Sequence, residues 1–102
     1  MPKSGILIAQ LIDYKGHFCD LSAAEHLFAT VETDLTITDR HLPFLTTAKL
    51  FLDHNRTKRA AEILALMPPP TKEDDLIELA VLKKRLQKAQ EKKHDRNRHT
   101  QY

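Results

Sequence analysis

The chain has 102 residues, 41% of them hydrophobic and 29% charged, and a net charge of +2. This length and composition favour one soluble globular domain with a modest core, and no apolar stretch is long enough to span a bilayer. Glycine occurs only twice, and apolar residues do not alternate with polar ones over a strand's length, so we expect an all-α fold.

The first two helices are predicted from an apolar run and a capping motif. The first is expected over residues 4–15, where apolar residues are dense, and "GHFCD" interrupts it. The second opens at "SAAE", where Ser22 can cap the amide of Glu25 and Glu25 can reach back, as in a capping box. It ends in the polar, β-branched stretch "ETDLTITD".

Three further helices follow from proline, asparagine and acidic residues. The third starts near residues 39–43, because Pro43 is tolerated only in a first turn, and Asn55 provides a left-handed stop after residue 54. The fourth covers residues 57–67 and is ended by "PPP". The fifth opens at Thr71 as cap, with three acids in its first turn. Its apolar face carries Leu76, Leu79, Leu82 and Leu86.

Two pairs of helices share short sequence matches. "AAEHL" at 23–27 recurs as "AAEIL" at 60–64, a shift of 37 residues, and "AQLI" at 9–12 recurs as "AKLF" at 48–51, a shift of 39. The first inter-helix turn is therefore expected to be two residues longer than the second. This pattern predicts two antiparallel helical hairpins followed by a C-terminal helix.

The second hairpin resembles a tetratricopeptide repeat. The large and small residues that the family requires are matched by Phe44, Ala48, Phe51, Ala60 and Leu64. The chain departs from the pattern at Thr47, where leucine is usual, and at Asn55, which replaces the turn glycine. The resemblance implies that Leu42, Leu45, Lys49 and Leu52 line a concave groove.

An excess of apolar surface suggests a partner. Leu45 and Leu52 form a stripe about 100° away from the side of the third helix that would meet the fourth. A leucine left in water forfeits roughly 1.5–3 kcal/mol of burial, so we expect the amphipathic helix of another small protein to bind there, forming a hetero-complex. The two other interpretations are that the five helices cover one another and that the chain self-associates. The expected groove comprises Ile8, Leu11, Leu42, Leu45, Lys49 and Leu52.

The N-terminal segment "ILIAQLIDYKGHFCDLSAAEHL" resembles the opening of a small chaperone family of bacterial type III secretion. The resemblance implies a tetratricopeptide-like, non-enzymatic protein that acts with a small helical-hairpin partner. Together they keep a needle subunit monomeric by binding its amphipathic C-terminal helix. It also implies a cytoplasmic location, which agrees with a single cysteine and with the lack of a signal-peptide apolar region.

The basic end of the chain offers an alternative function. Residues 83–102 carry eight Lys or Arg and two acids, whereas residues 1–82 carry eight and twelve. We expect a helical domain over residues 1–93 and a basic, disordered tail over 94–102. Nucleic-acid binding through the basic cluster is the alternative, although stacking aromatics are missing apart from Tyr102 and a solvated helix end is favoured. The cluster comprises Lys83, Lys84, Arg85, Lys88, Lys92 and Lys93.

No catalytic or metal site is expected. His17, Cys19 and His26 are close in sequence, but their spacing fits no usual zinc pattern and a fourth ligand is missing. A nucleophilic role for Cys19 would need a base that the sequence does not locate. Glycine-rich phosphate loops are absent from the sequence. We therefore expect a protein without enzymatic activity, metal or cofactor.

Overall fold

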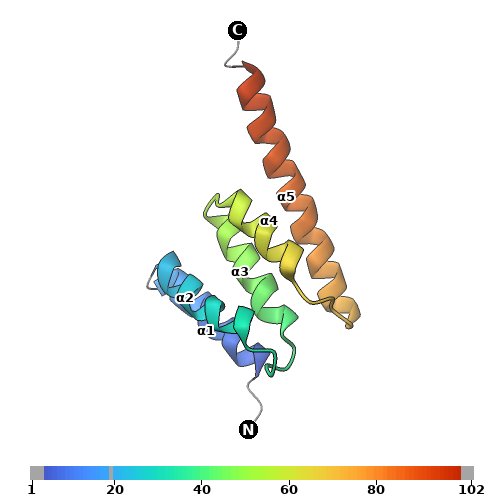
Figure 1. Cartoon of the computed structure of the whole chain (residues 1–102). Helices are drawn as coiled ribbons and strands as arrows, with labels where there is room; N and C mark the ends of the chain where they lie inside the picture. Colours follow the sequence, from blue (N-terminus) through green and yellow to red (C-terminus); the bar gives the residue numbers. More distant parts are fainter. Residues whose placement is uncertain (1–3, 19, 100–102) are drawn as a thin grey trace.

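The computed structural model describes residues 4–18 and 20–99, with side chains up to Glu91. Within this part of the chain the fold is all-α, as predicted, and consists of five helices (Figure 1). The helices are α1 (Gly5–Phe18), α2 (Leu21–Thr33), α3 (His41–Asp53), α4 (Thr57–Leu66) and α5 (Glu73–His99).

The third helix is the centre of the molecule. It contacts each of the other four helices, while α1 pairs with α2 and α4 packs against α5. In the described residues α1 and α5 do not touch each other, so they lie on opposite sides of α3 (Figure 1). The fold is therefore two helical hairpins with a fifth helix added, which is compatible with a helical repeat. The core residues come from all five helices and the loop before α3: Ile12, Ala24, Phe28, Val31, Ile37, Phe44, Leu45, Ala48, Leu50, Phe51, Leu52, Ala60, Ile63, Leu64 and Leu82.

The limits of α3 and α4 follow the local sequence signals. Pro43 lies in the first turn of α3, as expected, and Asn55 adopts a φ of 61° after its end. Asparagine tolerates this left-handed conformation better than most other residues with a side chain. The α4 helix stops at Leu66, two residues before the first proline of "PPP".

The start of α2 was predicted wrongly. The helix begins at Leu21, and the cap is Asp20, whose Oδ1 accepts a hydrogen bond from the Ala23 amide at 2.7 Å. An aspartate at this position satisfies a free amide as well as serine does. The capping box between Ser22 and Glu25 is therefore not formed.

The first helix extends three residues beyond its predicted end. It passes through Gly16 to Phe18, because Gly16 is buried where α1 crosses α3. A Cβ at this position would overlap the side chain of Leu50. Gly16 thus provides a close approach between two helices rather than a helix stop.

The fifth helix starts later and continues further than expected. Its first residue is Glu73, so Thr71 lies two residues before the helix instead of capping it, and the three acids occupy the first turn as predicted. The C-terminal half of α5 projects beyond the other helices (Figure 1). The backbone is described to His99, and the disordered tail over residues 94–102 stays a prediction.

In the second helices of the two hairpins, the shift between equivalent buried positions differs by one residue from the shift between the matching sequence segments. Ala9 and Ala48, which are 39 residues apart, are buried at equivalent positions of α1 and α3. In the second helices Ala24 is the buried counterpart of Ala60, a shift of 36 residues rather than 37. The matching sequence segments align Ala23 with Ala60, but Ala23 is only half-buried and is not the structural equivalent of Ala60. The buried positions of the first hairpin are thus three residues further apart than those of the second. The extra residues belong to α1, which continues to Phe18, whereas two residues separate α1 from α2 and three separate α3 from α4. The prediction of a longer first turn was therefore wrong.

Candidate functional site

The groove predicted on α3 is filled in this structure. Leu45 and Leu52 have exposed fractions of 1% and 8% and belong to the core, Leu42 is half-buried, and Lys49 is exposed. Leu45 lies about one turn after His41, whose ring contacts α5, so its side chain is on the side of α3 that α5 covers. The last helix of the chain therefore occupies the place that we had assigned to a partner helix.

Two polar contacts and an apolar stripe hold α5 on α3. His41 Nε2 lies 2.8 Å from Asp75 Oδ2 at the start of α5, and Arg85 donates to Asp53 Oδ1 over 2.7 Å further along the helix. Between these contacts Leu82 is buried in the core. Leu79 and Leu86, which pack against the core on the same stripe, are half-buried. The spacing of these leucines was recognised in the sequence, where cover of the third helix by the chain's own helices was one of the interpretations left open.

The exposed apolar residues gather instead on α1. Ile8 is half-buried, whereas Leu11 points outward together with residues that the sequence reasoning had not selected. Four large side chains with exposed fractions of 45–75% recur at helical spacing along one side. We call this set the α1 outer face: Leu7, Leu11, Tyr14 and Phe18.

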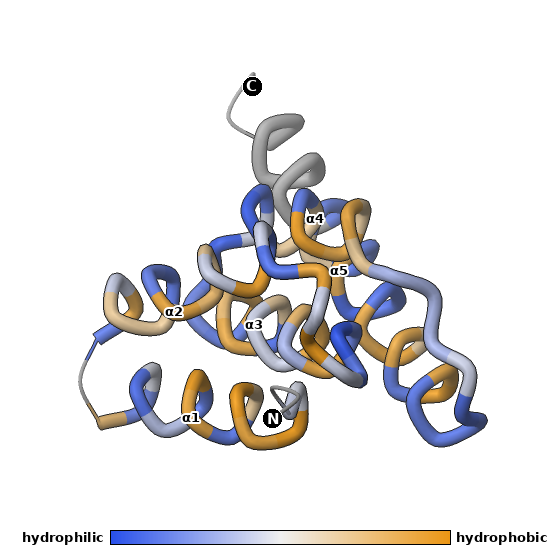
Figure 2. The backbone as a smooth tube through the Cα atoms, turned by 60° about the horizontal axis from the view of Figure 1, so that its bottom comes forward, coloured by the Kyte–Doolittle hydropathy of each residue, from blue (hydrophilic) through white to orange (hydrophobic). Residues whose placement is uncertain are grey.

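The α1 outer face is one continuous stripe. At about 100° per residue its four members fall within about 60° of the helix circumference. The rings of Tyr14 and Phe18 lie side by side, with centroids 4.9 Å apart. Figure 2 shows hydrophobic segments along α1 at the lower edge of the molecule. Single exposed leucines are common in soluble proteins, but a contiguous apolar stripe marks an interaction surface.

The composition of α1 explains why its large residues face outward. Its inner side, which packs on α2 and α3, is formed by Gly5, Ala9, Ile12 and Gly16. Three of these residues are small, so the backbone of α1 approaches its neighbours closely and leaves no room there for Leu7 or Tyr14. The helical spacing of Leu7, Leu11 and Tyr14 is the sequence signal that indicates this second apolar side.

A smaller apolar patch lies on α5. Leu76, Ile77 and Val81 are exposed on the helix half that packs against α3 and α4. Charged residues, including Glu73 and Glu78, lie close to them in sequence. This patch is shorter than the α1 outer face and contains no aromatic residue.

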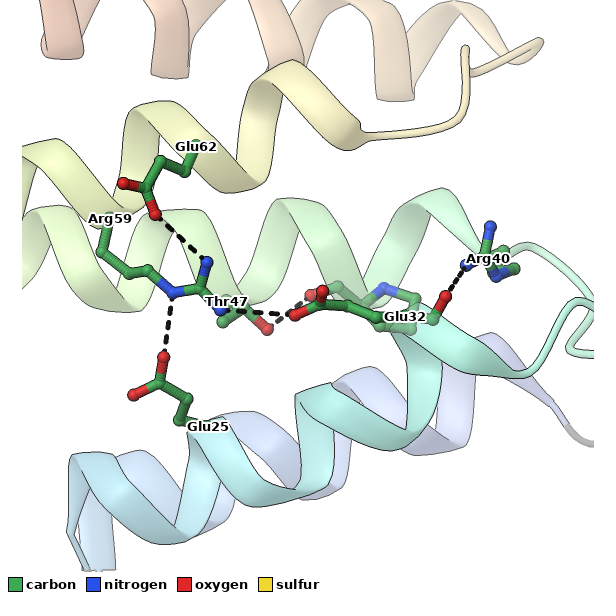
Figure 3. A network of polar contacts seen from close by, with 7 residues as sticks. Glu25, Glu32, Arg40, Thr47, Arg59 and Glu62 are labelled. Carbon is green, nitrogen blue, oxygen red and sulfur yellow. Dashed lines mark hydrogen bonds and ion pairs between the residues drawn. The ribbon is translucent and has the colours of Figure 1, made fainter.

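A polar network centred on Arg59 links α2 and α4 (Figure 3). The guanidinium of Arg59 donates to Glu25 at 2.9 Å and to Glu32 and Glu62 at 3.3 Å. Partial burial acts to lower the pKa of Arg59, but the hydrogen bonds to the three carboxylates and the negative charge of Glu25 outweigh burial and raise it. The guanidinium also lies 5.9 Å from the centre of the Phe28 ring.

This network has a structural role. Glu25 and Glu62 are the glutamates of the two "AAExL" segments, so both matching segments contact one arginine. An open hollow of 370 Å³ lies beside the network. The positive charge of Arg59 is compensated there by three carboxylates. The hollow is lined by Leu21, Ser22, Glu25, Phe51, Arg56 and Arg59.

Replacing Arg59 with methionine should lower the free energy of unfolding by about 1–2 kcal/mol, because charged hydrogen bonds and a cation–π contact are lost from a partly exposed site. Urea unfolding at low and high NaCl should show a smaller salt effect in this variant than in the wild type. The control is Lys58→Met, which removes the same charge from an exposed position of α4. An equal loss in both variants would contradict a specific role for the network.

A second arginine closes the end of α2. Arg40 donates to the carbonyl oxygens of Val31 and Glu32 at 2.9 Å and to that of Asp34 at 3.2 Å. The last four carbonyl groups of a helix have no amide partner within that helix, and Arg40 supplies donors to two of them, those of Val31 and Glu32. Its guanidinium also lies 5.4 Å from the centre of the Phe44 ring. Arg40 and Arg59 are therefore both engaged in holding the hairpins together.

The histidines and acids do not gather into a metal centre in the part of the chain that the structure describes. His17 Nε2 lies 3.1 Å from Asp13 Oδ1 on the surface of α1. The neighbouring Cys19 lies outside the described residues. Among the described helices, none combines the length and apolar character needed to cross a membrane.

The basic cluster begins on the part of α5 that packs on α3 and continues into the half that projects from the fold. Arg85 pairs with Asp53 of α3, while Lys83, Lys84 and Lys88 are exposed. The side chains of Lys92 and Lys93 lie outside the described ones. Nucleic-acid binding by this cluster stays a prediction.

A scan against protein-family models, a search of curated proteins and a search of solved structures found no match to this chain.

Proposed function

We propose that this protein is a non-enzymatic interaction module, a small chaperone or adaptor, that binds an amphipathic helix of a partner protein through the α1 outer face. The observation that carries the proposal is the exposure of Leu7, Leu11, Tyr14 and Phe18 along one side of a single helix. A partner helix recognises such a stripe through side chains spaced three or four residues apart. Complete burial of one leucine or phenylalanine is worth roughly 1.5–3 kcal/mol, so four of them can supply a stable complex.

This proposal keeps the function expected from the sequence and moves its site. The groove on α3 is filled by α5, whereas α1 retains an apolar side in the folded chain. The mechanism is binding by mass action: an aggregation-prone helix is protected for as long as free module exceeds it, and nothing in this process requires nucleotide or metal.

Two narrower assignments belong to the same proposal. The tetratricopeptide-like assignment is supported by Phe44, Ala48, Phe51, Ala60 and Leu64, which fall in the core as the family's pattern requires. The assignment to needle-subunit chaperones of type III secretion is supported by the N-terminal segment alone. Under that assignment the partner segment is the amphipathic C-terminal helix of a needle subunit.

The experiment is co-purification with the tagged full-length chain from its own cells. Leu11→Glu should reduce recovery of the stoichiometric partner at least tenfold, since it places a charge at the centre of the α1 outer face. Circular dichroism should stay unchanged, because Leu11 is partly exposed and glutamate is a good helix former.

The matched control is Leu35→Glu, which makes the same change at an exposed leucine in the loop between α2 and α3. This variant should retain the partner. Retention by Leu11→Glu, or loss in both variants, would refute the site.

A further inference from the structure

The internal repeat indicates what covers the α1 outer face. Helices α1 and α3 are equivalent with a shift of 39 residues, since Ala9 and Ile12 are buried like Ala48 and Phe51. The same shift makes Leu11 the equivalent of Leu50. The two leucines therefore lie on the same side of their respective helices.

These equivalent leucines differ in their surroundings. Leu50 has an exposed fraction of 2%, and Leu11 one of 45%. The difference has an identifiable cause, because α1 packs on α3 with Gly16 directly against Leu50, where even a Cβ would overlap the leucine side chain. In the described part of the chain, no helix takes the corresponding place on α1.

The uncovered side of α1 is also more apolar than its equivalent on α3. Leu7 corresponds to Thr46, and Tyr14 corresponds to Asp53. A side that remained in water would be expected to be the more polar of the two. The outer side of α1 is therefore more typical of a surface that another helix covers than the equivalent side of α3 is.

We propose that the partner segment is an α-helix that docks on α1 as α1 docks on α3, with a glycine, alanine or serine placed against Leu11. This inference rests on the proposed function and adds the chemistry of the bound helix: a small residue at the crossing point, with an apolar residue one turn before it, as Ile12 precedes Gly16 in α1. A second copy does not offer such a surface through α1, because the α1 outer face contains only large residues.

The probe is a labelled synthetic peptide with the sequence of residues 5–18, GILIAQLIDYKGHF, flanked by lysines for solubility. It carries the small-residue side that packs on Leu50 in the fold. We expect it to bind the full-length protein in fluorescence anisotropy. A peptide with Gly16→Leu should bind at least tenfold more weakly, although leucine favours the helix more than glycine does.

Protein variants locate the binding site of the peptide. Leu11→Glu should abolish binding and Leu35→Glu should retain it. Equal binding to the wild type and to Leu11→Glu would mean that the peptide replaces the chain's own α1 on α3, and it would overturn the inference. Equal affinity of the two peptides would overturn it as well.

Two outcomes separate this inference from the proposed function. If a partner is captured through Leu11 but the peptide does not bind, the partner docks in another manner and only the inference fails. If sedimentation of the protein alone shows a dimer that Leu11→Glu dissociates, the occupant is a second copy and a hetero-partner is excluded.

Discussion

Replacing Phe28 with alanine is expected to lower the free energy of unfolding by about 3–5 kcal/mol, the usual cost of removing a fully buried aromatic ring. Phe28 is completely buried in α2 and meets the ring of Phe44 edge-on, with centroids 4.9 Å apart. Its other side lies under the guanidinium of Arg59. The substitution thus leaves a cavity at the junction of three helices.

Urea unfolding followed by circular dichroism measures this effect. The matched control is Phe18→Ala on α1, where the ring has an exposed fraction of 75% and little packing to lose. The control should change stability by less than about 0.5 kcal/mol, as is usual for surface positions. A cost for Phe18→Ala equal to that for Phe28→Ala would contradict the exposure of the α1 outer face.

Replacing Leu82 with alanine is expected to cost about 2–5 kcal/mol. Leu82 alone among the described side chains of α5 is buried, and it belongs to the same core cluster as Leu45 and Leu52. Its removal should therefore weaken the packing of α5 on α3. Hydrogen exchange should therefore speed up in α3 and in α5 together, since the two helices are also joined by His41 and Asp75.

The control for Leu82 is its neighbour. Val81 has an exposed fraction of 52%, against 2% for Leu82, so Val81→Ala should leave both stability and exchange nearly unchanged. A larger effect from Val81→Ala would show that α5 packs through another side, and the groove on α3 would then be open to a partner.

Much of the fold could be predicted because its signals are local. Pro43 fixes the first turn of α3, and the three prolines after α4 end that helix wherever it packs. Asn55 marks a left-handed turn through its own backbone preference. The cap of α2 was missed because Asp20 and Ser22 are equally good caps, and only tertiary structure determines which of them is used.

The candidate site was harder to predict, because it depends on which helix covers which. Leu45 and Leu52 form an apolar stripe in either case, and the sequence contains no signal that α5 rather than a partner lies on it. Gly16 in its polar surroundings predicts a helix break, but in the structure its lack of a side chain allows the contact with Leu50. That contact turns Leu7 and Leu11 outward, a consequence of packing between segments far apart in sequence.

An NMR titration of the isotope-labelled protein with the peptide of residues 5–18 tests directly whether a guest helix docks on the α1 outer face. The largest chemical-shift changes are expected at the α1 outer face, which comprises Leu7, Leu11, Tyr14 and Phe18, while Leu45, Leu52 and Leu82 should be unaffected. Changes centred on those three core leucines, with α1 unchanged, would contradict docking on that face, because the guest helix would then have displaced α5 from α3.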